Sequence, residues 1–104
     1  MALIDEVKTA LRISSSNTVF DGEVQGLIDT AKIDLVQAGV LETKVNPDPP
    51  DEPDAIIKRA IITYAKANFG YDNPDADRFQ LAYVSLKQHL SLYGGYKASV
   101  PDET

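Results

Sequence analysis

The chain has 104 residues, which is enough for one domain with one modest hydrophobic core. It contains no cysteine, which excludes disulfides and thiolate metal sites and favours a reducing compartment such as the cytoplasm. Its formal net charge is −6, so binding of phosphate groups is not the default expectation. The first residues lack the basic and apolar regions of a signal peptide, and no stretch approaches the roughly 20 apolar residues of a membrane span.

Two helices are predicted in the first part of the chain. Residues 2–13 carry apolar side chains at helical spacing, and the polar run SSSN then ends the helix. Residues 18–40 carry a longer apolar stripe, made of Phe20, Val24, Leu27, Ile28, Ala31, Leu35 and Ala38. Asn17 or Thr18 is expected to cap the start of this second helix, and Gly39 is expected to end it in a left-handed conformation.

Two further helices follow. The third is expected to have Pro53 near its first turn and Gly70 just after its last. The fourth opens with the run DNPDAD, where Asp72 or Asn73 would cap the helix and Pro74 would take its first position.

These elements predict an all-α fold, a small bundle of four helices. A long acidic, proline-rich loop with the sequence ETKVNPDPPDEPD separates the second helix from the third. The predicted domains are a helical domain over 1–93 and an extended C-terminal arm over 94–104. The residues that share the inward helical phase are Leu27, Ile28, Leu35, Ile57, Ile61, Tyr64, Phe79, Tyr83, Leu86 and Leu90.

The fourth predicted helix is unusual because it has apolar residues on two sides. One side belongs to the predicted core, whereas Leu81, Val84 and Leu92 lie nearly opposite. Either this helix is central and is covered on both sides within the chain, or its second side meets another subunit. We expect a mixture, with the helix central and its outer stripe partly covered by a neighbour.

Other side chains also lie off the predicted core faces. Lys58, Arg59 and Lys66 form a basic face on the third helix, which is either a solvated face or a contact surface. The second helix carries Asp29 and Asp34, whose charges could pair with that basic face on a neighbour. The candidate subunit or partner interface therefore comprises Ile33, Lys58, Arg59, Ile62, Lys66, Phe69, Leu81, Val84, Tyr96 and Val100.

The search for catalytic chemistry yields little. His89 is the one histidine, and Ser85 precedes it by four residues, but nothing in the sequence activates that pair as a nucleophile. The run DPPDEPD could collect a weakly held cation, although a stiff solvated loop is the favoured interpretation. DNPDAD lacks the glycine and distal glutamate of a calcium loop. We therefore predict no enzyme activity, no metal and no cofactor.

The order of the elements resembles that of the small head–tail connector proteins of long-tailed bacteriophages, also described as head-completion or DNA-packaging proteins. The resemblance rests on LIDEVKTALRI, LIDTAKIDLVQAGV and AIIKRAIITYAKANFGYDNPDADRFQLAYVSLKQHLSLYGGY, and it covers nearly the whole chain. Element order and length carry it, whereas the string QLRG, which is sometimes associated with the family, is absent.

This resemblance implies a homo-oligomeric ring at the head–tail junction of a virion, assembled in the cytoplasm of the host bacterium. The expected partners are other copies of the chain, the portal protein above it and a tail-side connector or stopper protein. DNA would only pass through the channel, without specific binding, and no membrane is involved. A small cytoplasmic adaptor that binds one partner protein is the alternative, and a DNA-binding protein that uses the basic face is a weaker one.

The C-terminal run GGYKASVPDET predicts a hinge followed by an arm. Gly94 and Gly95 are expected to end the fourth helix, and Tyr96, Ala98 and Val100 then alternate with polar residues as in an extended strand. Such a strand gains stability only by docking on another surface. We expect an arm that is mobile in the monomer and buried in the assembly; a frayed terminus is the alternative.

Overall fold

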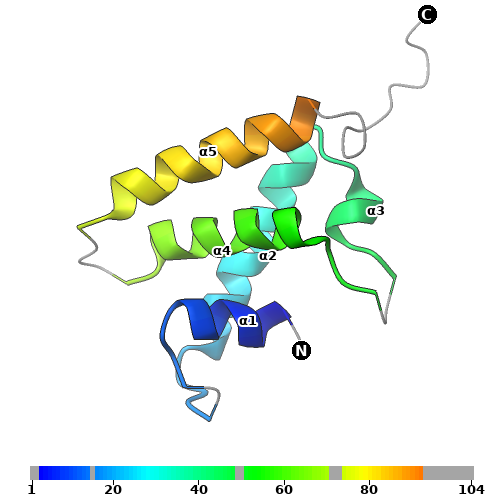
Figure 1. Cartoon of the computed structure of the whole chain (residues 1–104). Coiled ribbons are helices and arrows are strands. Elements are labelled where there is room, and N and C mark those ends of the chain that lie inside the picture. Colours follow the sequence, from blue (N-terminus) through cyan, green and yellow to red (C-terminus); the bar gives the residue numbers. More distant parts are fainter. Residues whose placement is uncertain (1–2, 15, 49–50, 71–73, 93–104) are drawn as a thin grey trace, which may run out of the picture.

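The computed structural model describes residues 3–14, 16–48, 51–70 and 74–92, and within these ranges it contains five helices and no β-strand. The helices are α1 (Leu3–Ala10), α2 (Asp21–Gln37), α3 (Glu42–Val45), α4 (Ala55–Asn68) and α5 (Ala76–Leu92), as Figure 1 shows. The all-α prediction is confirmed.

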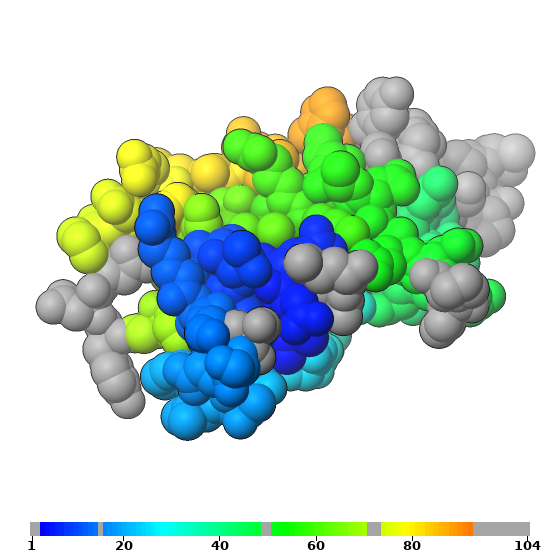
Figure 2. All heavy atoms as spheres, turned by 60° about the horizontal axis from the view of Figure 1, so that its bottom comes forward, coloured from blue at the N-terminus to red at the C-terminus, as the bar shows by residue number. Residues whose placement is uncertain are grey.

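Helix α4 lies at the centre of the molecule. It contacts α1, α2 and α5, and Figure 1 shows α2 crossing it steeply while α5 runs along it. Space-filling atoms show α1, in blue, lying against the green α4 (Figure 2). Ala60 and Ala65 widen the buried arc of α4, because small side chains let neighbouring helices approach closely. The prediction that the last helix is central was therefore wrong.

The core is built mainly from the inward faces of α2 and α4. Six of the ten predicted core residues are buried: Ile28, Leu35, Ile57, Ile61, Tyr83 and Leu90. Three others, Leu27, Tyr64 and Leu86, are partly buried and pack against that core. The prediction was wrong for Phe79, which lies at the edge between the cations of Lys66 and Arg78. Buried residues outside the predicted list include Val7, Val24, Ala31, Val40 and Val45.

Left-handed residues follow the ends of three of the described helices, and Gly70 comes just after α4, as predicted, with a φ of 82°. After α1, which ends at Ala10, this residue is Arg12, with a φ of 65°, so the helix stops before the serine run that was expected to end it. Gly39 ends α2 with a φ of 108°, as predicted, and the amide of Val40 donates to the carbonyl of Leu35. Glycine avoids the steric cost that an arginine meets in this conformation.

The predicted helix starts need correction. Helix α2 begins at Asp21 after Phe20, and Asn17 instead accepts a hydrogen bond from the amide of Val19 at 3.1 Å. Helix α5 begins at Ala76, so Pro74 precedes it. The expected caps Asp72 and Asn73 lie outside the described residues.

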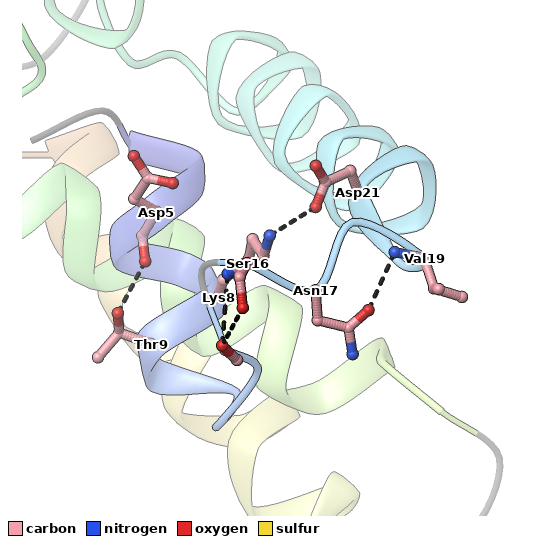
Figure 3. Close-up of polar contacts among 8 residues, drawn as sticks. Asp5, Lys8, Thr9, Ser16, Asn17, Val19 and Asp21 are labelled. Carbon is pink, nitrogen blue, oxygen red and sulfur yellow. Dashed lines mark hydrogen bonds and ion pairs between the residues drawn. The ribbon is translucent and has the colours of Figure 1, made fainter.

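An ion pair that helical periodicity does not predict connects α1 to α2. The Lys8 ammonium lies 2.7 Å from an oxygen of Asp21, and Lys8 is only 2% exposed (Figure 3). Asp21 is in the first turn of α2, where a negative charge also complements the positive helix end. The pair thus fixes α1 against the start of α2.

The acidic loop begins with a helix of its own. Helix α3 occupies the run ETKV, and the amide of Val45 donates to the carbonyl of Leu41 at 3.1 Å. Val45 is fully buried, which explains why this part of the loop folds onto α2. The described fold therefore has five helices instead of four. The predicted C-terminal arm lies outside the described residues.

Candidate assembly surfaces

A groove of about 870 Å³ runs between α4 and α5, and we call it the α4–α5 groove. Its apolar lining comes from both helices, and its rim carries the basic residues of α4. The residues that line it are Glu6, Ala55, Lys58, Arg59, Ile62, Thr63, Lys66, Phe79, Ala82, Ser85, Leu86 and His89. Of the predicted interface residues, the structure brings Lys58, Arg59, Ile62 and Lys66 together here.

The charges along this groove differ in their surroundings. The Lys58 ammonium donates to Glu52 at 2.7 Å and to Glu6 at 2.9 Å, and these bonds raise the pKa of Lys58. The same bond to Lys58 lowers the pKa of Glu52. Arg59 is exposed and forms no ion pair within the described ranges. Lys66 lies over the ring of Phe79, 5.5 Å from its centroid.

Helix α5 exposes a second apolar face, as its sequence predicts. Leu81 is 73% exposed and Leu92 is 75% exposed, and Val84 is also classed as exposed. These side chains are in helical phase with one another and lie away from buried Tyr83 and Leu90. Within the described part of the chain, no other helix covers this face.

Helix α2 presents Ile33 on its outer face, where this side chain is 59% exposed. A hollow of about 470 Å³ adjoins it, lined by Asp29, Lys32, Ile33, Val36, Gln37, Glu42 and Asn46. The carboxylate of Asp29 accepts a hydrogen bond from the side-chain amide of Gln25 at 2.9 Å. This surface is thus an apolar centre with charged neighbours.

The sequence profile of the phage connector protein family matches residues 3–97. The chain belongs to the phage connector protein family. This membership confirms the resemblance inferred from the order of the helices and assigns the chain a structural role in a phage connector. No curated protein and no solved structure matches the chain.

In this connector protein Asp34 holds α5 on α2, so it does not belong to the outer face. Its carboxylate accepts a hydrogen bond from the Tyr83 hydroxyl at 2.6 Å and one from Lys87 at 3.0 Å. Burial alone would raise the pKa of Asp34, but the bonds from Tyr83 and Lys87 lower it below its ordinary value. Burial and the bond to Asp34 raise the pKa of Tyr83.

This network changes the predicted charge pairing between subunits. The predicted pairing joins Lys58, Arg59 or Lys66 to a neighbour's Asp29 or Asp34. Lys58 and Asp34, however, already have partners within their own chain. Asp29 and Arg59 form no ion pair within the described ranges, so the predicted pairing between subunits is reduced to these two. No sequence pattern indicates the Asp34–Tyr83 bond, because its partners are 49 residues apart.

Two predicted interface residues of the connector are more enclosed than expected. Ile62 and Phe69 are partly buried and pack against the core. The Phe69 ring meets Phe20 edge to face, with 5.5 Å between ring centroids. Replacing either by serine would therefore perturb the monomer as well as any contact. Tyr96 and Val100 lie outside the described residues.

Ser85 and His89 both line the α4–α5 groove. Phage connector proteins are structural rather than catalytic. In the described ranges, no group of three or more histidine, cysteine, aspartate or glutamate side chains is placed to hold a metal. None of the described helices is both long and apolar enough to cross a membrane.

Proposed function

We propose that the chain is a subunit of a homo-oligomeric ring at the head–tail junction of a bacteriophage or prophage particle. The ring docks below the portal, extends the DNA channel and offers its opposite side to a tail-side connector or stopper protein. Assembly takes place in the cytoplasm of the host bacterium. Family membership supports the connector role, and the exposed apolar residues support the assembly of copies.

The exposed second face of α5 is the observation that carries this proposal. Leu81, Val84 and Leu92 would cost free energy if they remained in water, at about 25 cal/mol per Å² of apolar surface. Ile33 adds a separate exposed apolar residue on α2. Surfaces of this kind on different helices suit a subunit with neighbours on more than one side.

The net charge also suits a channel protein. At −6, the chain as a whole repels the phosphate backbone, so DNA would pass without adhering. Tyr96 and Val100 are proposed to dock on a neighbour or on the portal, as part of an arm over residues 94–104.

Interruption of the gene in the phage that encodes it tests the proposal. The expected result is DNA-filled heads without attached tails, seen by electron microscopy, and rescue by the gene supplied from a plasmid. Normal tailed particles without the gene product would refute the connector role. A strict monomer that binds one host protein and is dispensable for particles would instead support the adaptor alternative.

A further inference from the structure

The α4 wall of the α4–α5 groove is basic, although the chain as a whole is acidic. Helix α4 contains three basic residues and no acidic one. The one acidic residue that lines the groove is Glu6, which binds Lys58. The groove floor is apolar, with Ile62, Phe79 and Leu86. An occupant of complementary chemistry would be a helix with an apolar centre and an acidic surround.

Helix α2 has this chemistry. It contains four acidic residues and one basic residue, Lys32. Two of the acidic residues, Glu23 and Asp29, are exposed and form no ion pair within the described ranges. Ile33 stands at the centre of the outer face, and Gly22 and Gly26 share its helical phase. A Cβ at either glycine would have no neighbour within 4 Å, so this part of the face is low and open.

A single subunit cannot combine these two surfaces. Helix α2 packs on α4 through its buried side, with Ile28 and Leu35, so Ile33 points away from its own α4. The α4–α5 groove lies on a different side of α4, between α4 and α5. The two surfaces therefore meet only between two copies of the chain.

We propose that the outer face of α2 on one copy docks in the α4–α5 groove of the next. Ile33 enters the apolar floor beside Ile62, and Asp29 faces the basic rim at Arg59. The contact is heterologous, because different surfaces meet, and such a contact closes into a ring when its rotation fits. This inference rests on the proposed ring and specifies which surfaces form it.

The absence of native cysteine permits a direct test by cross-linking. Ile33→Cys places one thiol on the α2 face, and Ser85→Cys places another on the exposed wall of the groove. Gln88→Cys is the matched control, because Gln88 is exposed on the same helix but does not line the groove. The full-length variants are mixed in pairs at high concentration, alone and on isolated portal rings, and are treated with a short bismaleimide.

The expected result is a cross-linked dimer from Ile33→Cys with Ser85→Cys, at least tenfold more than from either variant alone or from the Gln88→Cys pair. The double variant Ile33→Cys/Ser85→Cys should give a ladder of oligomers. Higher salt should reduce the yield, because the rim charges are screened.

Four results would overturn the inference. Cross-linking of Ile33→Cys with itself would show a symmetric contact through α2. Rings that form without an Ile33–Ser85 cross-link would show that other surfaces meet, and would leave the ring proposal intact. Protein that stays monomeric with and without portal rings would refute both. Protection of Ser85→Cys by double-stranded DNA instead of by a second copy would identify the groove as a nucleic-acid site.

Discussion

The hydroxyl of Tyr83 is the most direct link between α5 and α2, so Tyr83→Phe should destabilise the monomer. The hydroxyl donates to the Asp34 carboxylate at 2.6 Å, and Tyr83 itself is 2% exposed. The ring would still pack edge to face on Tyr64, with centroids 5.1 Å apart, so the substitution removes little more than the hydrogen bond.

The expected loss follows from the chemistry of that bond. A hydrogen bond to a charged group contributes about 1.5–3 kcal/mol. The Asp34 side chain is 36% exposed and would keep its contact with Lys87, so water and Lys87 compensate in part. We therefore expect a loss of about 1–2 kcal/mol. For a domain of this size, each 1 kcal/mol lowers the melting temperature by about 4–8 °C.

Urea unfolding followed by circular dichroism at neutral pH measures this loss. The matched control is Tyr64→Phe, because the Tyr64 hydroxyl makes no hydrogen bond among the described residues while its ring faces Tyr83. The control should change stability by less than about 0.5 kcal/mol. Equal effects of the two substitutions would refute the contribution assigned to the Tyr83–Asp34 bond.

The pH dependence gives a second test of the same bond. Because the pKa of Asp34 lies below its ordinary value of 3.8 in the folded state, its contribution is present above that pH and is lost as the pH falls through the folded pKa. Because the pKa of Tyr83 is raised above its ordinary value of 10.0, its contribution is present below that pH and is lost at more alkaline pH. The difference between wild type and Tyr83→Phe should therefore shrink at both extremes; a constant difference would contradict this account.

Three further predictions concern the core, a helix and the arm. Leu90→Ala should lower the free energy of unfolding in urea by about 2–5 kcal/mol, because Leu90 is fully buried. Leu86 is only partly buried, so Leu86→Ala should lower it by about 1–2 kcal/mol. A larger loss for Leu86→Ala than for Leu90→Ala would show that α5 packs on α4 through a different face. Gly26→Ala should stabilise the monomer by about 0.5–1 kcal/mol, because Gly26 lies inside α2 with open space around it; a loss of stability would show a hidden contact. Deletion of residues 95–104 should leave the helical signal of the remaining chain unchanged and impair particle completion; infectious particles at normal yield would show that the arm is dispensable.

Helical periodicity predicts the four long helices well, because the apolar stripes are long and regular. It also predicts the left-handed turn at Gly39, where glycine avoids a steric cost. It misses α3, because this helix has only four residues and one buried side chain, Val45, and is too short for an apolar stripe. The proline-rich residues that follow also favour a loop. It misses the early end of α1 at Ala10, because the left-handed residue that follows is Arg12, and arginine does not favour positive φ.

The central position of α4 could not be read from helical phase. A wheel shows which side of a helix is apolar, but it does not show how many neighbours share that side. Ala60 and Ala65 carry the relevant signal, because small residues permit close packing on a wide arc. The two apolar faces of α5 instead predict a central helix, but its second face is exposed in the structure.

For the candidate surfaces, the sequence identifies residue types but not their partners. It groups Lys58, Arg59 and Lys66 on one face, and the structure places all three along the α4–α5 groove. It cannot show that Glu6 and Glu52 bind Lys58, because Glu6 lies 52 residues away along the chain and competing charges are numerous. Pairing of distant charges depends on helix packing, which only the fold defines.

Localisation of the chain on purified particles tests the central claim most directly. Gold-labelled antibodies against the chain, viewed by electron microscopy on disrupted and intact particles of the phage that encodes it, would show where it resides. The account predicts gold at the vertex that joins head to tail, on tailed particles and on the neck of detached heads. Gold on the tail tip or capsid faces, or chain present only in the particle-free lysate, would contradict it.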